Sequence, residues 1–441
     1  RSIGLTKATA MVVGTIIGAS IFVQPSVISA QVPSKTAVFL VWAIAGVLTL
    51  FGALVAAELA SAFPRSGGVY VFLKEEFSPA FGFLWGWAMF WTMHSGIIAA
   101  IAVVFARYVG QFVPLDDTGV RAVAIAGIIV LSGINYLGVR PGSIVQTAFT
   151  FGKVLAILIM IAVGFSLGSA APEPVVQAAD PSALAISPRD FALALVAGLF
   201  AFGGWHMVTY AAGETLEPRK TIPRALLIGT LVVTASYIAL NAVYFHVLPL
   251  ATVISSTRVA ADAAEAVTGA GGAAAVSGLV IFSTFGALSG IILAGPRVYY
   301  SMARDGLLFR WVGAIHTRYR TPYRAIILQA IWSSVLVATG TYRALFTRVI
   351  YTEWIFFGLM AFGLFLLRRR PGYAPLYRVW GFPVVPAVFV IASGIIVLNQ
   401  IFADPLESAS GLLLVAVGLP IYYIWIRRQH SDEGAPTGEH H

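Results

Sequence analysis

The stretch GTIIGASIF, residues 14–22, places Gly14 and Gly18 inside an apolar run that extends from about residue 8 to residue 30. A run of about 20 apolar residues is long enough to cross a bilayer as a helix. Glycine costs a helix about 1 kcal/mol relative to alanine, and helices broken within the membrane are typical of transporter substrate sites. The stretch therefore predicts an interrupted membrane helix. Close packing against a neighbouring helix is the alternative role for its glycines.

The composition is that of a protein with many membrane spans. The chain has 441 residues, of which 59% are hydrophobic and 11% charged, whereas soluble domains are about 25% charged. The basic residues lie in short segments between apolar runs, which argues against a nucleic-acid surface. The chain has no cysteine, which excludes a disulfide, a thiolate metal site and a cysteine nucleophile. We expect neither a metal nor another cofactor.

The apolar runs predict an all-α integral membrane protein with twelve transmembrane helices and no soluble domain between them. The predicted spans cover residues 8–31, 36–62, 83–112, 120–139, 143–168, 188–213, 223–248, 272–302, 322–341, 345–367, 381–403 and 408–428. Nineteen lysines and arginines fall in loops on the side of the N-terminus, and six fall on the other side. The positive-inside rule therefore predicts a multi-pass cell-membrane protein with both termini in the cytoplasm.

A second break is predicted in span six, where Gly203 and Gly204 interrupt the apolar pattern. Transporters built from inverted repeats place such breaks at matching positions in each half. We therefore expect a five-plus-five inverted repeat with discontinuous helices one and six. Residues 1–168 form the first repeat, residues 169–367 the second, and residues 368–441 two further spans with a cytoplasmic tail.

The two break glycines and one lysine are predicted to lie at the same depth in the membrane. Gly18, Gly203 and Lys153 each lie roughly ten residues from the inner end of their spans, or about 15 Å at a rise of about 1.5 Å per residue. The hydrocarbon core is about 30 Å thick. The two breaks and the lysine should therefore share the bilayer midplane.

Broken helices would present free backbone groups to a ligand at that depth. N–H groups at the start of a helix attract an anion, and carbonyl groups at its end attract a cation. The expected N–H donors are Ala19, Ser20 and Ile21. The expected carbonyl acceptors are Thr15, Ile16, Leu199, Phe200 and Ala201. A small zwitterion satisfies both ends, so the pattern predicts an α-amino acid as substrate.

Two charged residues inside the spans are functional candidates. A charge in mid-membrane is costly and usually marks function. Lys153 could act as a fixed cation at the carbonyl end of the inner half of span one, or could release its proton during transport. Reaching a water-filled crevice for structural reasons is the alternative. Glu353 could contact a substrate amine or carry a proton, or could simply be a structural partner for another side chain.

Several uncharged or weakly basic residues complete the candidate site. Phe200, beside the second break, is the expected gate over the substrate. Ser95, in the third span, is a further predicted substrate contact. The neighbouring His94, and His206 in span six, are more often hydrogen-bonded packing residues than proton relays. We treat Glu58, near an inner end, as structural.

The inner segment RDGLLFRWVGAIHTRYRTPYR, residues 304–324, mixes basic and aromatic residues. Such a mixture is typical of segments that lie against lipid headgroups. A simple topology signal is the alternative.

Five motifs together resemble the L-type amino acid transporter family of the amino acid, polyamine and organocation superfamily. They are GTIIGASIF, AELASAFPRSGGVYVFL (57–73), FAFGGW (200–205), EPRKTIPRAL (217–226) and PRVYYSMARDGLLF (296–309). The resemblance covers nearly the whole chain. It implies the inverted-repeat fold of the leucine-transporter type and sodium-independent movement of amino acids, often as obligatory exchange.

The resemblance also assigns residues by position. Ile16, Ala19 and Ser20 match the family's backbone contacts to substrate, and Gly203 its site in span six. Phe200 matches the family's aromatic gate, and Lys153 a lysine that occupies the region of a sodium site in sodium-coupled relatives.

The sequence departs from the family in three places. The first break reads Gly18-Ala19-Ser20 where the family usually has Gly-Ser-Gly, which keeps the backbone donors but reduces backbone freedom. Some relatives carry an uncharged polar residue at the position of Glu353. Animal members are joined to a glycoprotein subunit by a disulfide, which a chain without cysteine cannot form.

The resulting prediction is an exchanger of small or neutral L-amino acids that works by alternating access and is not an enzyme. The alternative is a proton-coupled symporter in which Lys153 or Glu353 titrates. A protonated lysine at the cation site disfavours sodium symport. Ser20, His94 and His206 form no recognisable hydrolase motif, and a single chain with two broken helices argues against a channel.

Overall fold

The computed structural model describes residues 3–65, 67–138, 143–170, 186–304, 306–308 and 311–424. This part of the chain is helical, and its only bridge between extended residues joins Ile3 to Thr215. Nine of its helices are long and apolar enough to cross a membrane. Three shorter apolar helices are Leu5–Ile16, Phe151–Leu167 and Tyr323–Thr339. The predicted all-α membrane protein is thereby confirmed, whereas the repeat boundaries stay a prediction and the tail, 425–441, lies outside the described residues.

Among the described residues, the first half of the fold, up to residue 170, contains ten helical elements. They are α1 (Leu5–Ile16), η1 (Ser20–Phe22), α2 (Gln24–Gln31), α3 (Lys35–Ala62), α4 (Val69–Glu76), α5 (Pro79–Ala88), η2 (Met89–Met93), α6 (His94–Val109), α7 (Asp117–Tyr136) and α8 (Ser143–Leu167). The second half continues with α9 (Pro188–Ala201), η4 (Trp205–Glu214), α10 (Pro218–Val247), α11 (Leu250–Ser255), α12 (Val259–Thr268), α13 (Ala270–Arg304), α14 (Tyr323–Thr339), α15 (Tyr342–Leu367), α16 (Val384–Ala403) and α17 (Pro405–Ala416).

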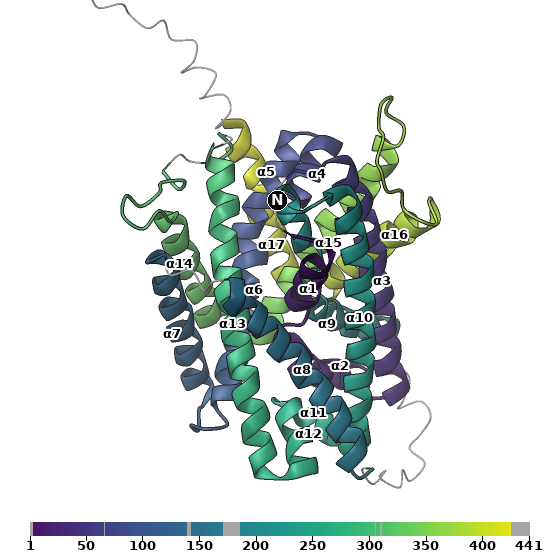
Figure 1. The fold of residues 1–441 in the computed structure, drawn as a ribbon, viewed down its shortest axis with the longest axis vertical. Coiled ribbons are helices and arrows are strands. Elements are labelled where there is room, and N and C mark those ends of the chain that lie inside the picture. The colour runs from purple at the N-terminus through teal and green to yellow at the C-terminus, as the bar shows by residue number, and fades with distance from the viewer. Residues whose placement is uncertain are drawn as a thin grey trace, which may run out of the picture.

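The interrupted segments lie at the centre of the bundle, and α7 and α14 lie at its edge (Figure 1). Burial supports this arrangement. In each span the most apolar stretch of 18 residues was compared, and its buried share is 83% in Pro79–Val109, 72% in Pro188–Gly213 and 72% in Tyr342–Leu367. The corresponding windows of Asp117–Tyr136 and Pro405–Ile424 are only 28% and 22% buried. Side chains of the outer helices therefore face the hydrocarbon of the membrane, where apolar exposure carries no penalty.

Local sequence fixes the start of the helix that leads to the second break. The Ser187 hydroxyl accepts a hydrogen bond from the Asp190 N–H at 3.1 Å, and Pro188 occupies the first helical position. Serine is a favoured N-cap, proline is preorganised for the first turn, and an aspartate there complements the helix dipole. The start of α9, and with it the position of Gly203 and Gly204, is thus set by its own residues.

Candidate functional site

The first membrane segment is interrupted where the glycine spacing predicts. Helix α1 ends at Ile16, and the Ile17 N–H donates the last regular bond, 2.8 Å to the Val13 carbonyl. The Gly18 N–H then folds back to the Ile16 carbonyl at 2.7 Å. The chain continues through the short η1 into α2, so the hydrogen-bond ladder is broken between the two halves of the segment.

Three consecutive N–H groups in this break have no acceptor among the described residues: those of Ala19, Ser20 and Ile21. The turn after them is closed instead through their carbonyl groups, because the N–H groups of Phe22 and Val23 donate to the oxygens of Ala19 and Ser20. The three residues are 0%, 7% and 0% exposed. Buried N–H groups are rarely left without a partner, so this arrangement is suited to a bound anion.

The second segment is interrupted after α9. The Phe202 N–H is shared between the carbonyls of Gly198 and Leu199, and the Gly203 N–H donates to the Phe200 carbonyl at 3.0 Å. Gly204 has a φ of +90°, a conformation that favours glycine. The chain then resumes as η4, a 3-10 helix rather than the α-helix that the sequence suggests.

The two breaks contact each other directly. The Thr15 hydroxyl is bonded within its own helix, 2.8 Å from the Met11 carbonyl, and also lies 3.3 Å from the Gly204 carbonyl. A Cβ atom at Gly204 would lie 3.1 Å from the Thr15 carbonyl oxygen. A glycine is therefore needed at position 204 for two reasons: the backbone has a positive φ there, and α1 approaches it closely.

Tyr237 of α10 joins the same two breaks and was missed by sequence reasoning. Its buried hydroxyl lies 2.9 Å from the Ile16 carbonyl and 3.0 Å from the Ala201 carbonyl, and donates its proton to this pair. The available signal was a tyrosine inside an apolar span, since a buried tyrosine hydroxyl needs a hydrogen-bond partner.

Tyr237 also narrows the set of carbonyl groups left for a ligand. The Ile16 oxygen accepts from both Gly18 and Tyr237, and a carbonyl has two lone pairs. The Phe200 oxygen already accepts one hydrogen bond, from the Gly203 N–H, and has one lone pair left. The Thr15 carbonyl, by contrast, receives no hydrogen bond from any residue that the structure describes, so it is the acceptor best placed for a cation.

Phe200 is the first residue in a series of aromatic and polar contacts that leads away from the second break. Its ring centroid is 5.5 Å from that of Phe346 in α15, which is 5.3 Å from that of Tyr342. The Tyr342 hydroxyl accepts from Gln24 in α2 at 3.2 Å, and the Arg107 guanidinium lies 4.8 Å from its ring. The predicted gate thus continues into contacts between α2, α6 and α15.

Glu353 is buried in α15, two turns beyond Phe346. Its carboxylate makes no hydrogen bond or ion pair with a described residue. The nearby Tyr210 of η4 is within electrostatic range of this carboxylate. The carboxylate remains available to a proton or a substrate amine.

Lys153 is 5% exposed in α8, a helix that packs against α1 and α10. Within the described part of the chain, no carboxylate pairs with its ammonium group and no hydrogen bond joins it to Thr15 or Ile16. The structure therefore places the helix of Lys153 beside the inner half of the first segment, and the role of the ammonium group stays a prediction.

The hydroxyl of Ser95 is engaged within its own helix. It donates 2.6 Å to the Phe90 carbonyl, across the π-helical turn η2. Sequence patterns did not predict this turn, although π-helical turns are frequent at functional sites. The adjacent His94 is bonded through Nε2 to the Ile291 carbonyl at 2.8 Å, which agrees with a packing role.

His206 lies in an aromatic cluster, with its ring 5.0 Å from that of Phe357 and 5.5 Å from that of Trp205. Among the residues that the structure describes, no group of three or more histidine, aspartate or glutamate side chains could hold a metal ion.

Known amino acid transporters resemble this chain over nearly its whole length. A family model described as amino acid permease matches residues 3–426. The chain is 31% identical to the Serine/threonine exchanger SteT of Bacillus subtilis, over 98% of each protein. It is 30% identical to the Asc-type amino acid transporter 1 of Mus musculus, over 97% of this chain and 81% of that protein. It is 29% identical to the Cystine/glutamate transporter of Homo sapiens, over 97% of this chain and 85% of that protein.

Proposed function

Because the chain belongs to the amino acid permease family, we propose that it exchanges small or neutral L-amino acids across a cell membrane without sodium. The relatives support exchange by their names, one a serine/threonine exchanger and another a cystine/glutamate transporter. The cytoplasmic position of both termini, inferred from the distribution of basic residues, belongs to the same proposal.

The observation that carries the proposal is the set of three buried N–H groups at Ala19, Ser20 and Ile21. A substrate carboxylate would accept from these donors at the positive end of the outer half of the segment. The free carbonyl of Thr15, on the other side of the same break, would accept from the substrate ammonium. An α-amino acid carries both charged groups on one carbon atom, so it can contact both sides of the break at once.

The contacts between the two segments support a mechanism of alternating access. Thr15, Gly204 and Tyr237 tie the two breaks together, so the amino acid would contact elements of both repeats. Opening toward one side would move the outer layer around Tyr342, and opening toward the other would move α1. Lys153 would supply the positive charge that a sodium ion supplies in sodium-coupled transporters.

A proton-coupled symporter is the second candidate, favoured by one observation. Lys153 and Glu353 are both buried and neither forms an ion pair with a described residue. A buried ionisable group without a partner can gain or lose its proton as its surroundings change.

Counterflow in proteoliposomes tests the proposal and separates the two candidates. Labelled alanine or serine is supplied outside, with unlabelled amino acids or none inside, and with or without sodium and proton gradients. An exchanger takes up label only when amino acid is present inside, and the rate is independent of sodium. Uptake into empty vesicles driven by a proton gradient would support the symporter, and uptake that requires sodium would contradict both.

A further inference from the structure

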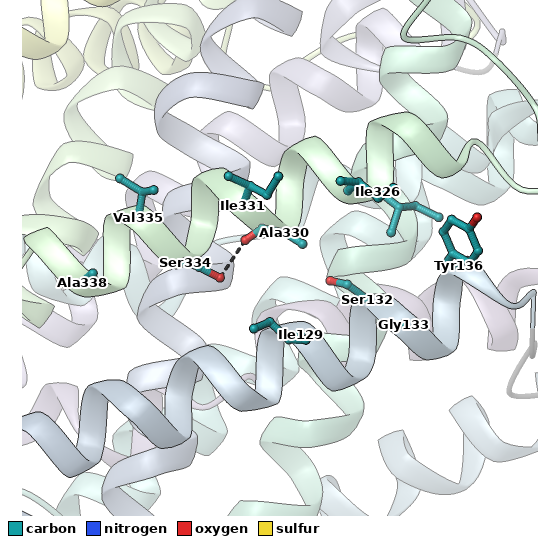
Figure 2. Close-up of a pocket in the computed structure, with 11 residues that line it drawn as sticks. Ile129, Ser132, Gly133, Tyr136, Ile326, Ala330, Ile331, Ser334, Val335 and Ala338 are labelled. Atoms are coloured by element: carbon teal, nitrogen blue, oxygen red, sulfur yellow. Dashed lines mark hydrogen bonds between the residues drawn. The ribbon is translucent and has the colours of Figure 1, made fainter.

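A cavity of about 530 Å³ lies between α7 and α14 at the edge of the bundle, away from the two breaks (Figure 2). We call it the α7–α14 groove and define it by lining residues of both helices: Ile129, Ser132, Gly133, Ile327, Ile331 and Val335. The isoleucine and valine side chains are between 40% and 58% exposed. Since both helices are apolar and peripheral, this exposed face lies in the hydrocarbon of the membrane.

The groove has the length of one leaflet. Along α14 it extends from Ile326 to Ala338, which is about 18 Å at a rise of about 1.5 Å per residue. Half of the hydrocarbon core is about 15 Å. A single acyl chain lying along the helices would fill it from end to end.

One end of the groove carries a group of cations. Arg318, Arg320 and Arg324 precede or begin α14, on the side of the bundle where the N-terminus lies (Figure 1). We call these three residues the arginine cluster. Residues 306–352 contain no aspartate or glutamate, and none of the ion pairs among the described residues involves the cluster. The cluster therefore has unbalanced positive charge at the membrane surface.

Aromatic contacts fix the cluster to the mouth of the groove. Tyr136, which lines the groove at the end of α7, has its ring centroid 5.5 Å from that of His316 and 6.0 Å from that of Tyr323. The Tyr323 hydroxyl accepts from Arg324 Nε at 2.8 Å, and the Arg324 guanidinium is 5.5 Å from the ring of Trp311. The cations and the groove thus form one continuous surface.

Ser132 provides a polar contact inside the groove. The residue is 5% exposed, and its buried hydroxyl has no hydrogen-bond partner among the described residues. Serines in helices commonly donate to the carbonyl four residues earlier, as Ser334 does to Ala330 across the same groove (Figure 2). Ser132 precedes Tyr136 by one turn, about 6 Å, which is the depth of an ester carbonyl beneath a headgroup phosphate.

We propose that the α7–α14 groove binds one anionic phospholipid from the leaflet on the side of the N-terminus. The acyl chain lies between the two helices, the Ser132 hydroxyl donates to an ester carbonyl, and the arginine cluster binds the phosphate. A negatively charged headgroup is expected because no ion pair among the described residues neutralises the cluster, and guanidinium groups bind phosphate through paired, charge-assisted hydrogen bonds.

Native mass spectrometry of the purified full chain in detergent tests the proposal, with phosphatidylglycerol and phosphatidylcholine of identical acyl chains as probes. We expect one phosphatidylglycerol per chain, bound at least tenfold more tightly than phosphatidylcholine. Inorganic phosphate should not displace it, because phosphate lacks the chain that fills the groove. Equal binding of the two lipids, or displacement by phosphate, would overturn the proposal.

Two glycines provide a matched pair of variants. A Cβ at Gly133 meets no atom within 4 Å, so Gly133→Leu would project into the groove without disturbing the fold. Gly394 of α16 is equally open, and Gly394→Leu is the control. We expect Gly133→Leu to lose the phosphatidylglycerol adduct and Gly394→Leu to keep it, with thermal unfolding confirming that both are folded. If Gly133→Leu kept the phosphatidylglycerol adduct, the groove would not be the lipid site. If the wild type and Gly394→Leu were dimers and Gly133→Leu a monomer, the groove would be a contact between two chains and the proposal would be refuted.

The headgroup contact is tested by a double variant of exposed residues, Arg318→Gln with Arg320→Gln. It should reduce the preference for phosphatidylglycerol over phosphatidylcholine at least tenfold while leaving residual binding of both lipids, since the groove itself is intact. An unchanged preference would exclude the arginine cluster as the phosphate site.

Discussion

Lys153 is a buried cation without an ion-pair partner among the described residues. Its burial costs several kcal/mol in a membrane unless a functional environment compensates. We expect Lys153→Met to lower the exchange rate at least tenfold while the melting temperature stays the same or rises, because methionine removes the charge and keeps most of the volume. Initial counterflow rates and thermal unfolding measure the two effects.

The control is Lys220→Met, which breaks an exposed pair with Glu217. Such surface pairs contribute at most about 1 kcal/mol, so transport and stability should both be retained. A Lys153→Met protein that exchanges at the wild-type rate would remove Lys153 from the mechanism.

Glu76, at the end of the short helix α4 outside the membrane spans, predicts a pH dependence of stability. Its carboxylate oxygens are buried without a hydrogen-bond partner, and Arg370 donates to the backbone carbonyls of Glu75 and Glu76 instead. Burial raises the pKa of Glu76 well above its ordinary value, and the Arg370 charge opposes this only in part. The folded state therefore holds this proton more tightly than the unfolded chain does.

The sign follows from that raised pKa. The stabilisation is complete below the unfolded pKa of about 4.3 and is lost as the pH rises through the folded pKa. We expect the wild-type melting temperature to fall as the pH rises from about 4.3 toward the raised pKa of folded Glu76, and Glu76→Gln to reduce that fall. Glu75→Gln, at the neighbouring surface position, should leave it in place. Identical pH profiles for wild type and Glu76→Gln would contradict this account of Glu76.

At the scale of the elements, Gly204 is the position where the second break depends on a single residue type. A side chain there would adopt a left-handed conformation, which costs roughly 1–2 kcal/mol, and would meet the Thr15 carbonyl at 3.1 Å. We expect Gly204→Ala to lower both the melting temperature and the exchange rate, because α1 must move away from the second break.

Gly18→Ala is the matched change in the first break. Its added Cβ would lie 3.8 Å from the Ile16 oxygen, an ordinary contact, so stability should change little. Equal tolerance of the two substitutions would show that the breaks do not depend on this close approach.

The positions of both interruptions could be predicted from sequence, because paired glycines inside apolar runs are local signals. The kind of helix that follows could not. Whether η4 is 3-10 and η2 is π-helical depends on which carbonyl each N–H finds in the packed bundle. For the same reason the carbonyls of Thr15 and Ile16 looked equivalent in the sequence, whereas Tyr237 occupies only the second.

At the scale of the whole molecule, Glu58 joins distant parts of the chain. This buried carboxylate accepts from Arg368 Nε at 2.9 Å and from the Val379 N–H at 2.6 Å. It therefore ties α3 to the end of α15 and to the segment before α16. The sequence indicated a structural role for Glu58 but not its partner, since a contact 310 residues away leaves no local pattern.

Removing this carboxylate should destabilise the bundle. Glu58→Ala leaves the Arg368 guanidinium largely buried without its partner, a change that typically costs about 3–5 kcal/mol. Glu407→Ala removes an ion pair with Arg348 in which the N–O distance is 4.0 Å and the glutamate side chain is 41% exposed. This change should lower the free energy of unfolding by less than about 1 kcal/mol. Thermal unfolding in detergent compares the two, and equal melting temperatures would show that Glu58 is not the tie between these elements.

The most direct test of the central claim is inhibition of alanine counterflow by alanine analogues that lack one charge. If the N–H groups of Ala19, Ser20 and Ile21 bind the carboxylate and the Thr15 carbonyl binds the ammonium, unlabelled L-alanine should inhibit. Alanine methyl ester and N-acetylalanine should each be at least tenfold weaker, because each lacks the charge that one of the two sets of backbone groups binds. Inhibition by either analogue as strong as that by L-alanine would contradict a site built from the two helix breaks.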